Sequence, residues 1–328
     1  MKIETTLAGS YPKLPTSPGD INLRVVKNRR DQGKATEQDV QDAVRQTTRR
    51  ILEIQERAGV DLPVDGAAGW DDAQTYVARG LGGFQIAGLI RYLDTNTYYR
   101  QPEIVGPVTW KGPITVEDFR AAQAMSERPV KAFLPGPYSL YRFSKDRHEG
   151  NEGEALAAIG AALAKEAGAL EEAGARWIHF EEPWLGRAHA EDAPKARAAL
   201  APLLEGRKAK TTVHVPFTAP TAVFDAIREL PWTAIGLDLR EAPAGWDLLP
   251  RIPEGRTVAL GLIDARNTKL EEADEVAREI ARARAARPDL AYQLSTTASL
   301  EYLPADKAEL KVTRLVEAAR TASRNGGS

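Results

Sequence analysis

The sequence contains no cysteine. This absence excludes disulfides, thiolate nucleophiles and every metal site built on cysteine sulfur. No apolar run reaches the roughly 18 residues of a membrane-spanning helix. The first residues, MKIETTLAGSYPKLP, lack the positive-then-apolar order of a signal peptide. We therefore expect a cytoplasmic protein that does not enter a membrane.

An excess of charge of either sign is also missing. The 328 residues carry 44 Lys and Arg against 46 Asp and Glu, a net charge of −2. Such a chain has no polycationic footprint for nucleic acid. No G-x-G-x-x-G string follows a predicted strand, which disfavours a dinucleotide-binding fold. The expected partner is therefore a small molecule, and no oligomeric state is assigned.

Short β-rich runs alternate with longer helical ones along the chain. Thr36 and Asp39 form a typical helix start, and Gly59 a typical helix end. Eight β/α units in about 300 residues favour a closed parallel (β/α)8 TIM barrel, an α/β fold, over an open sheet. We expect strands at 3–8, 60–65, 130–134, 177–180, 210–214, 234–239, 258–263 and 292–295, and helices near 36–58, 154–174, 191–206, 219–229, 269–286 and 304–322.

We predict a single domain over residues 1–328. Residues 66–128 are more than one β/α unit needs, so we interpret them as an inserted segment with a helix at 115–127. Residues 324–328, rich in glycine, are predicted to be a frayed tail.

Polar side chains follow nearly every predicted strand. In a parallel barrel the functional residues lie at the carboxyl ends of the strands. A barrel core has no need of this pattern, which therefore indicates a small polar ligand. The expected substrate-binding residues are Ser10, Lys13, Asp65, Tyr138, Glu182, Trp184, Arg240 and Arg266.

The catalytic candidates are Glu181, His214 and Asp238. Imidazole and a buried carboxylate can both titrate near neutral pH, so His214 and Glu181 are the predicted acid–base groups. Glu181 and Glu182 are adjacent, and two like charges cannot share a site cheaply, so at most one is expected to act.

The cations at the strand ends have two interpretations. Arg240, Arg266 and Lys13 would form a pocket for a substrate carboxylate. Alternatively, the two arginines pair with Glu241 and Asp264 and only neutralise the rim. Two tryptophans, Trp70 and Trp184, either roof a pocket or pack beneath the inserted segment.

Several strings occur in a specific order: LAGSYPKLP, YYRQPEIVGPVTW, RPVKAFLPGPYSL, WIHFEEPWL and GLIDARN. Together they resemble the catalytic barrel of the cobalamin-independent methionine synthases, in a one-barrel form that covers nearly the whole chain. The resemblance implies a TIM barrel of the uroporphyrinogen-decarboxylase and methionine-synthase superfamily. It also implies a methyltransferase of methionine biosynthesis.

In that family a zinc ion held by one histidine, one glutamate and two cysteines activates the thiol of homocysteine. The resemblance places His214 on the histidine and Asp238 on the glutamate, but Pro216 and Ala298 on the two cysteines. We therefore expect no zinc. His214 and Asp238 remain as residual ligands, and a harder metal held by these two and Glu181 is the alternative.

The resemblance implies further losses. The family's substrate-binding glutamate falls on Ala67, and its catalytic histidine on Arg266. The carboxylate that binds the amino group of homocysteine becomes Glu181, one methylene longer.

Our interpretation is a methionine-synthase-like enzyme that transfers a methyl or other one-carbon group without zinc–thiolate activation. It would use a small anionic, amino-acid-like substrate, and the methyl donor, a methyl-folate or a methyl-corrinoid, is left open. One alternative is a metal-free carbon–carbon lyase or decarboxylase of the same superfamily. The other is a non-catalytic barrel that binds a metabolite or a partner protein.

Overall fold

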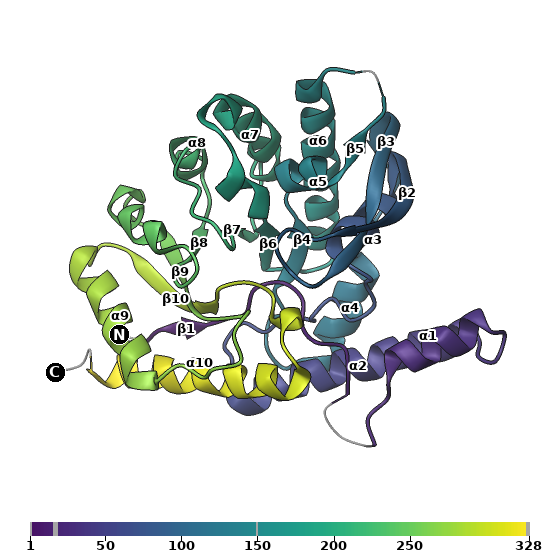
Figure 1. Ribbon diagram of the computed structural model, residues 1–328. Helices are drawn as coiled ribbons and strands as arrows, with labels where there is room; N and C mark the ends of the chain where they lie inside the picture. Colours follow the sequence, from purple (N-terminus) through teal and green to yellow (C-terminus); the bar gives the residue numbers. More distant parts are fainter. Residues whose placement is uncertain (1, 16–18, 149, 326–328) are drawn as a thin grey trace.

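The computed structural model describes residues 2–15, 19–148 and 150–325. Seven parallel strands curl into one sheet in the order β1-β10-β9-β8-β7-β6-β4 (Figure 1). Most of these strand residues are buried, as expected for parallel strands covered on both faces. The strands are β1 (Glu4–Thr5), β4 (Ala132–Pro135), β6 (Trp177–Glu181), β7 (Lys210–Val215), β8 (Ala234–Asp238), β9 (Thr257–Ile263) and β10 (Ala291–Thr296).

Residues 62–64 connect the two edges of this sheet. Leu62 forms a parallel bridge with Thr6 beside β1, and Val64 forms one with Lys131 beside β4. Pro63 between them has no N–H to donate, so the predicted strand at 60–65 is reduced to these two bridges. The ring of eight parallel segments is nevertheless complete, and the predicted α/β barrel is confirmed.

Helices cover the outside of the sheet (Figure 1). The predicted start of α2 is confirmed, since Thr36 and Asp39 form a capping box, and Gly59 ends the helix with φ 98°. The predicted helices at 191–206 and 219–229 are shorter than expected, and Pro202 and Pro220 lie where helix was predicted. The covering helices are α2 (Glu37–Ala58), α4 (Val116–Met125), α6 (Glu152–Glu172), α7 (Ala193–Leu200), α8 (Phe224–Arg228), α9 (Ala273–Ala286) and α10 (Ala305–Asn325).

Shorter helices occupy several loops. The α-helices are α1 (Leu23–Asp31), α3 (Ala73–Gly80) and α5 (Pro137–Phe143). The 3-10 helices are η1 (Pro183–Arg187), η2 (Ala190–Asp192), η3 (Ala201–Leu203), η4 (Pro243–Asp247), η5 (Leu249–Arg251) and η6 (Leu300–Tyr302).

The segment at 66–128 contains more than the single helix expected from the sequence. After α3 it forms an antiparallel hairpin of β2 (Leu81–Arg91) and β3 (Tyr98–Trp110), which the sequence analysis missed. A short strand, β5 (Lys145–Asp146), pairs with β3 in parallel. The hairpin stands beside α5 and α6 (Figure 1). At the C-terminus, Arg324 belongs to α10 rather than to the predicted frayed tail, of which 326–328 lie outside the described residues.

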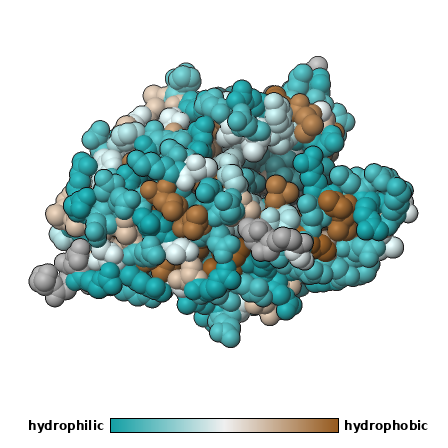
Figure 2. Space-filling model, turned by 60° about the horizontal axis from the view of Figure 1, so that its bottom comes forward, coloured by the Kyte–Doolittle hydropathy of each residue, from teal (hydrophilic) through white to brown (hydrophobic). Residues whose placement is uncertain are grey.

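The surface in Figure 2 is largely hydrophilic, with small separated hydrophobic patches. In the described part of the chain, no helix combines the length and the apolar character needed to cross a membrane.

Glu166 in the middle of α6 holds the end of the hairpin against the barrel. Its side chain is fully buried. The carboxylate accepts hydrogen bonds from the indole of Trp110 at 2.8 Å, the backbone N–H of Ile114 at 3.0 Å, and both the N–H and hydroxyl of Thr115 at 2.7 and 2.8 Å. These donors compensate the buried charge without a cation.

We therefore expect Glu166→Ala to lower the free energy of unfolding by at least about 3 kcal/mol, because two buried and two partly buried donors lose their acceptor. Urea unfolding followed by circular dichroism measures this change. Glu172→Ala, an exposed position at the end of the same helix, should change the free energy by no more than about 0.5 kcal/mol. Equal losses in the two variants would contradict the assignment.

Candidate active site

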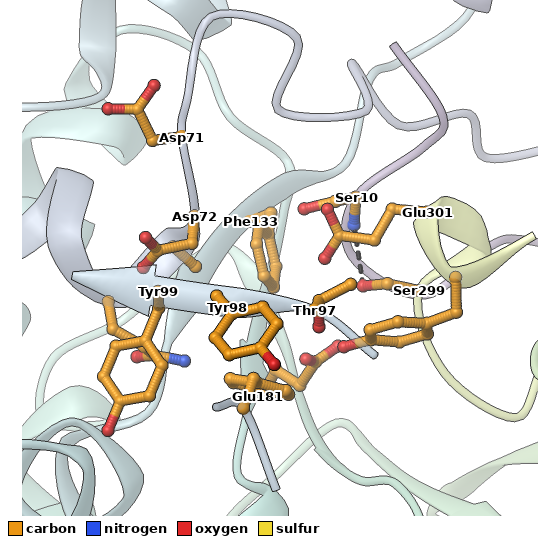
Figure 3. Close-up of a pocket in the computed structure, with 14 residues that line it drawn as sticks. Ser10, Asp71, Asp72, Thr97, Tyr98, Tyr99, Phe133, Glu181, Ser299 and Glu301 are labelled. Atoms are coloured by element: carbon orange, nitrogen blue, oxygen red, sulfur yellow. Dashed lines mark hydrogen bonds between the residues drawn. The ribbon is translucent and has the colours of Figure 1, made fainter. Parts of the chain in front are cut away.

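A cavity of about 240 Å³ lies at the carboxyl ends of the barrel strands, beneath the hairpin. Figure 3 shows Asp71 and Asp72 on one side of it and Ser10, Ser299 and Glu301 on the other. Three loops line the cavity: the loop that follows β1, the loop that follows residues 62–64 and the loop that follows β10. Strands β4 and β6 and the hairpin complete the wall. The lining residues are Ser10, Asp71, Asp72, Ala73, Gln74, Tyr92, Thr97, Tyr98, Tyr99, Phe133, Glu181, Ser299, Glu301 and Tyr302.

Glu181 is the last residue of β6 and is 5% exposed. Burial raises the pKa of its carboxyl to about 8, and the nearby Glu301 raises it further, against Lys131 and a hydrogen bond with Ser299. Oε2 has no hydrogen-bond partner among the described residues. Glu181 is therefore mostly protonated at neutral pH and titrates in the range that suits an acid–base group.

Gly9 makes room for this carboxylate. Its φ is +46°, and a Cβ built there would lie 2.9 Å from Oε2 of Glu181 and overlap the hydroxyl of Ser299. That hydroxyl accepts a 2.9 Å hydrogen bond from the backbone N–H of Ser10. The turn after β1 thus keeps Ser10, Ser299 and Glu181 together at the cavity.

Two histidines and a lysine fill the barrel interior close to Glu181. The rings of His179 and His214 are 5.3 Å apart, and neither residue is part of the cavity wall. His214 donates from Nε2 to the carbonyl of Thr297 at 2.9 Å, and burial lowers its pKa to about 4. Both nitrogens of His179 and Nδ1 of His214 lack hydrogen-bond partners in the described part of the chain.

Lys131 is the cation of this interior layer and is 2% exposed. Its ammonium donates to the carbonyl of Leu7 at 2.6 Å. Burial lowers its pKa to about 7, against the attraction of Glu4 and Glu181.

The catalytic role predicted for His214 stays a prediction; its neutral ring lies in this interior layer rather than in the cavity wall.

Asp238, at the end of β8, holds two loops. It accepts backbone hydrogen bonds from Phe217 at 3.1 Å, Arg240 at 3.0 Å and Glu241 at 2.9 Å, and burial raises its pKa to about 6. Phe217 has an unusual φ of 70°, and its ring contacts Tyr302 of the cavity at 5.8 Å. Asp238 therefore supports the cavity wall from behind.

Glu182 points away from its neighbour Glu181. It caps the N-terminus of α5 by accepting from the N–H of Tyr138 at 3.0 Å, the N–H of Ser139 at 2.7 Å and the Ser139 hydroxyl at 2.5 Å. Tyr138 is itself 1% exposed and lies under Arg142. Neither Glu182 nor Tyr138 lines the cavity, so of the two adjacent glutamates only Glu181 reaches it.

The predicted cationic pocket does not form. Arg240 donates to the carbonyl of Leu262 and forms an ion pair with Glu279 of α9 at 2.8 Å. Arg266 pairs with Glu241 at 2.7 Å, as the alternative interpretation stated. The third cation, Lys13, donates to the carbonyl of Trp70. Each cation has a partner of its own, and none lines the cavity.

The remaining predicted residues surround the cavity without lining it. Asp65 accepts from the N–H of Ala67 at 2.9 Å, and burial raises its pKa to about 6. Trp184 packs edge-on against Phe143. Trp70 stacks on Phe133 with ring centroids 5.6 Å apart, so it backs a cavity residue by packing.

Sequence reasoning missed most of the cavity lining. Ser299 and Glu301 follow the last strand in the string STTASLEYLP, one turn beyond the strand-end residues that were considered. Tyr92, Tyr98 and Tyr99 come from the missed hairpin. The sequence feature that could have indicated this lining is the cluster of tyrosines in RYLDTNTYYR. It was not enough, because only the hairpin places these tyrosines over the mouth of the barrel.

The residues at the family's zinc positions do not fit a zinc ion. In the described part of the chain, no three His, Asp or Glu side chains gather into a group that could hold a metal. His214 donates from Nε2 to a carbonyl, and Asp238 already accepts three backbone N–H groups. Pro216 and Ala298 supply no ligand atom.

Comparison with known proteins gives the family. Residues 3–321 match the family described as "Cobalamin-independent synthase, Catalytic domain". The chain belongs to this family. The resemblance seen in the sequence is thereby confirmed.

Two relatives and one solved structure illustrate the match. The chain is 27% identical over 321 residues to the methionine synthase of Pyrococcus abyssi, covering 97% of this chain and 92% of that protein. It is 27% identical over 282 residues to the methionine synthase of Saccharolobus solfataricus, covering 85% and 82%. A B12-independent methionine synthase from Shewanella sp. W3-18-1, solved in complex with selenomethionine, shares the fold with a TM-score of 0.85, 22% identity and 99% coverage of both chains.

The raised pKa of Glu181 makes stability depend on pH. Its folded pKa of about 8 exceeds the ordinary 4.5, so the folded state holds a proton that the unfolded state releases between these values. The contribution of Glu181 to stability is complete below about pH 4.5 and is lost as the pH rises through about 8.

Glu181→Gln removes this titration, so the variant should gain stability over the wild type as the pH rises from 5 to 9. Each pKa unit corresponds to about 1.4 kcal/mol, so we expect the difference in melting temperature to grow by several degrees. Differential scanning fluorimetry across this range measures it. The exposed Glu205→Gln should show a constant difference; a constant difference for Glu181→Gln would refute the buried, raised pKa.

Proposed function

We propose that this chain is an enzyme that transfers a methyl or other one-carbon group to a small amino-acid-like acceptor, with Glu181 as the acid–base group. Membership of the cobalamin-independent synthases supports the reaction class. The observation that carries the assignment of Glu181 is its buried, unpartnered Oε2 at the cavity. A buried carboxyl oxygen left without a hydrogen-bond partner costs stability, and a purely structural barrel would have no need of it.

The proposed role of Glu181 is to take the proton of the acceptor's nucleophile, a step that only the ionised minority of this carboxyl performs at neutral pH. A thiol has an ordinary pKa of about 8.5, close to the pKa of about 8 of Glu181. Matched values let the proton pass from the sulfur to Oε2 with little free-energy cost. The sulfur lone pair then attacks the one-carbon group, and the protonated Glu181 returns its proton to solvent after product release.

The charge of the lining favours a zwitterionic or cationic acceptor over the anion expected from the sequence. The cavity wall contains the carboxylates of Asp71, Asp72, Glu181 and Glu301, whereas none of the described lining residues is basic. An acceptor's ammonium group would therefore lie among carboxylates. A decarboxylase-type reaction is less well supported, since a substrate carboxylate would find no cation in this wall.

We expect Glu181→Gln to lower kcat for methionine formation from L-homocysteine by a factor of about 10² to 10⁴, the usual contribution of a general base. The measurement is mass-spectrometric detection of methionine with a panel of methyl donors that includes a methyl-folate and a methyl-corrinoid. Glu205→Gln, outside the cavity, should retain the wild-type rate. A Glu181→Gln variant as fast as the wild type would remove Glu181 from the mechanism.

Proton removal by Glu181 also implies that no zinc–thiolate is required. Incubation with a strong chelator, followed by gel filtration, should leave the rate within about twofold, because no step depends on a bound metal. Loss of activity that returns on addition of zinc would show that the proposed activation is wrong.

A further inference from the structure

Gln74 is a polar residue of the cavity wall that the proposed function does not use. It is the second residue of α3 and is 4% exposed. Its side-chain Oε1 has no hydrogen-bond partner among the described residues. A buried carbonyl oxygen without a donor costs stability. Because Gln74 lines the cavity, a ligand bound there can supply the missing donor.

A second free acceptor, the carboxylate of Glu301, lies in the same wall. Figure 3 shows it reaching from the loop after β10 into the cavity. It makes no hydrogen bond and no direct ion pair within residues 2–15, 19–148 and 150–325. The charge of Lys13 acts on Glu301 from a distance, but the ammonium of Lys13 donates to the carbonyl of Trp70 and does not line the cavity. The carboxylate therefore keeps its hydrogen-bonding capacity for a ligand.

The other carboxylates of the wall have separate tasks. Asp71 pairs with two cations of its own, at 3.2 and 3.1 Å. Asp72 caps α3 by accepting from the N–H and the hydroxyl of one threonine, at 2.7 and 2.5 Å. Glu181 is the proposed acid–base group. Glu301 and Gln74 are thus the acceptors that remain for binding.

The aromatic rings of the wall offer little free face to a cation. Tyr92 is stacked on Phe143 with centroids 4.7 Å apart and lies 6.4 Å from Tyr302. Phe133 is stacked on Trp70 at 5.6 Å. No Lys, Arg or His occurs among the lining residues that the structure describes. The wall therefore suits a positive group that is held by oxygen acceptors rather than by ring faces.

A primary ammonium group matches these acceptors. It carries one positive charge and three N–H donors. A hydrogen bond between an ammonium and a carboxylate is about twice as strong as one between neutral groups. At about 240 Å³ the cavity has room for an amino acid, since drug-sized ligands occupy roughly 300–1,000 Å³.

We infer that Glu301 and Gln74 bind the primary ammonium group of the acceptor amino acid and thereby select it, while Glu181 takes the proton of its thiol. The identity of the acceptor and the task of Glu181 rest on the proposed function. The ammonium site itself does not. Ala67, which the resemblance places on the family's substrate-binding glutamate, is buried and does not line the cavity. Glu301 supplies a carboxylate from a different loop.

Calorimetry without a methyl donor tests the ammonium contact. The probes are L-homocysteine and 4-sulfanylbutanoate, which lacks only the amino group. We expect L-homocysteine to bind at least about 100 times more tightly, because the analogue leaves both acceptors unpaired. Equal affinities, or no binding of L-homocysteine, would overturn the inference.

Two variants assign the contact to its residues. Glu301→Gln should weaken the binding of L-homocysteine about 10- to 100-fold, the range for a lost hydrogen bond between charged groups. Gln74→Leu, a change of similar volume, should weaken it about three- to tenfold. Neither variant should weaken the binding of 4-sulfanylbutanoate, which has no ammonium to lose. The exposed Glu205→Gln should change neither affinity.

The two ligands also distinguish a binding role from a structural one. Circular dichroism verifies that each variant is folded, and if one variant does not fold the other carries the test. A folded Glu301→Gln or Gln74→Leu that weakens both ligands equally, or neither, would contradict the inference.

Turnover separates this inference from the proposed function. In methionine formation, Glu301→Gln should raise KM for L-homocysteine as it raises Kd, while kcat stays within about threefold, because the ammonium contact is the same before and during the transfer. Methionine formation with an unchanged KM in both variants would overturn the inference and leave the proposed function intact. Selective loss of L-homocysteine binding in Glu301→Gln, in a protein that forms no methionine from any donor, would contradict the proposed function and leave the ammonium site.

Discussion

One carboxylate, buried at the end of a barrel strand without a cation in contact, is the constraint on which the rest of the site depends. Glu181 is 5% exposed, and its Oε2 has no partner among the described residues. Burying an ionised carboxylate is costly unless it is compensated. Burial in the barrel instead raises the pKa of this carboxyl to about 8. The buried Lys131 partly opposes this rise, because its positive charge favours the ionised carboxylate. Gly9 and Ser299 then leave the carboxylate facing the cavity rather than covered.

The other buried acids show that this arrangement is specific to Glu181. Glu166, Glu182 and Asp238 each accept at least three hydrogen bonds, and each holds a loop or a helix end. Glu182 differs from Glu181 by one position in the chain, yet it caps α5 because successive residues of an extended chain point to opposite sides. A buried carboxylate therefore either holds a loop or a helix end or faces the cavity, depending on how many hydrogen-bond donors surround it.

The sequence was sufficient for the barrel and for the position of Glu181 at a strand end, because both depend on local periodicity. The catalytic role of Glu181 stays a prediction. It was not sufficient where the outcome depends on distant partners. Arg240 turns toward Glu279, 39 positions away, and nothing near Arg240 in the sequence indicates that choice. The hairpin was missed because prolines and glycines interrupt its strands, with register shifts near Gly82 and Ile86. Since the hairpin supplies three tyrosines of the cavity, the aromatic character of the site was missed with it.

The departures from the family's zinc site and the character of the cavity fit together chemically. A zinc ion lowers the pKa of a bound thiol, so a site without the two sulfur ligands needs another way to form the thiolate. In the mechanism proposed above, a base whose pKa is close to that of the thiol would meet this need, and burial gives Glu181 a pKa of about 8.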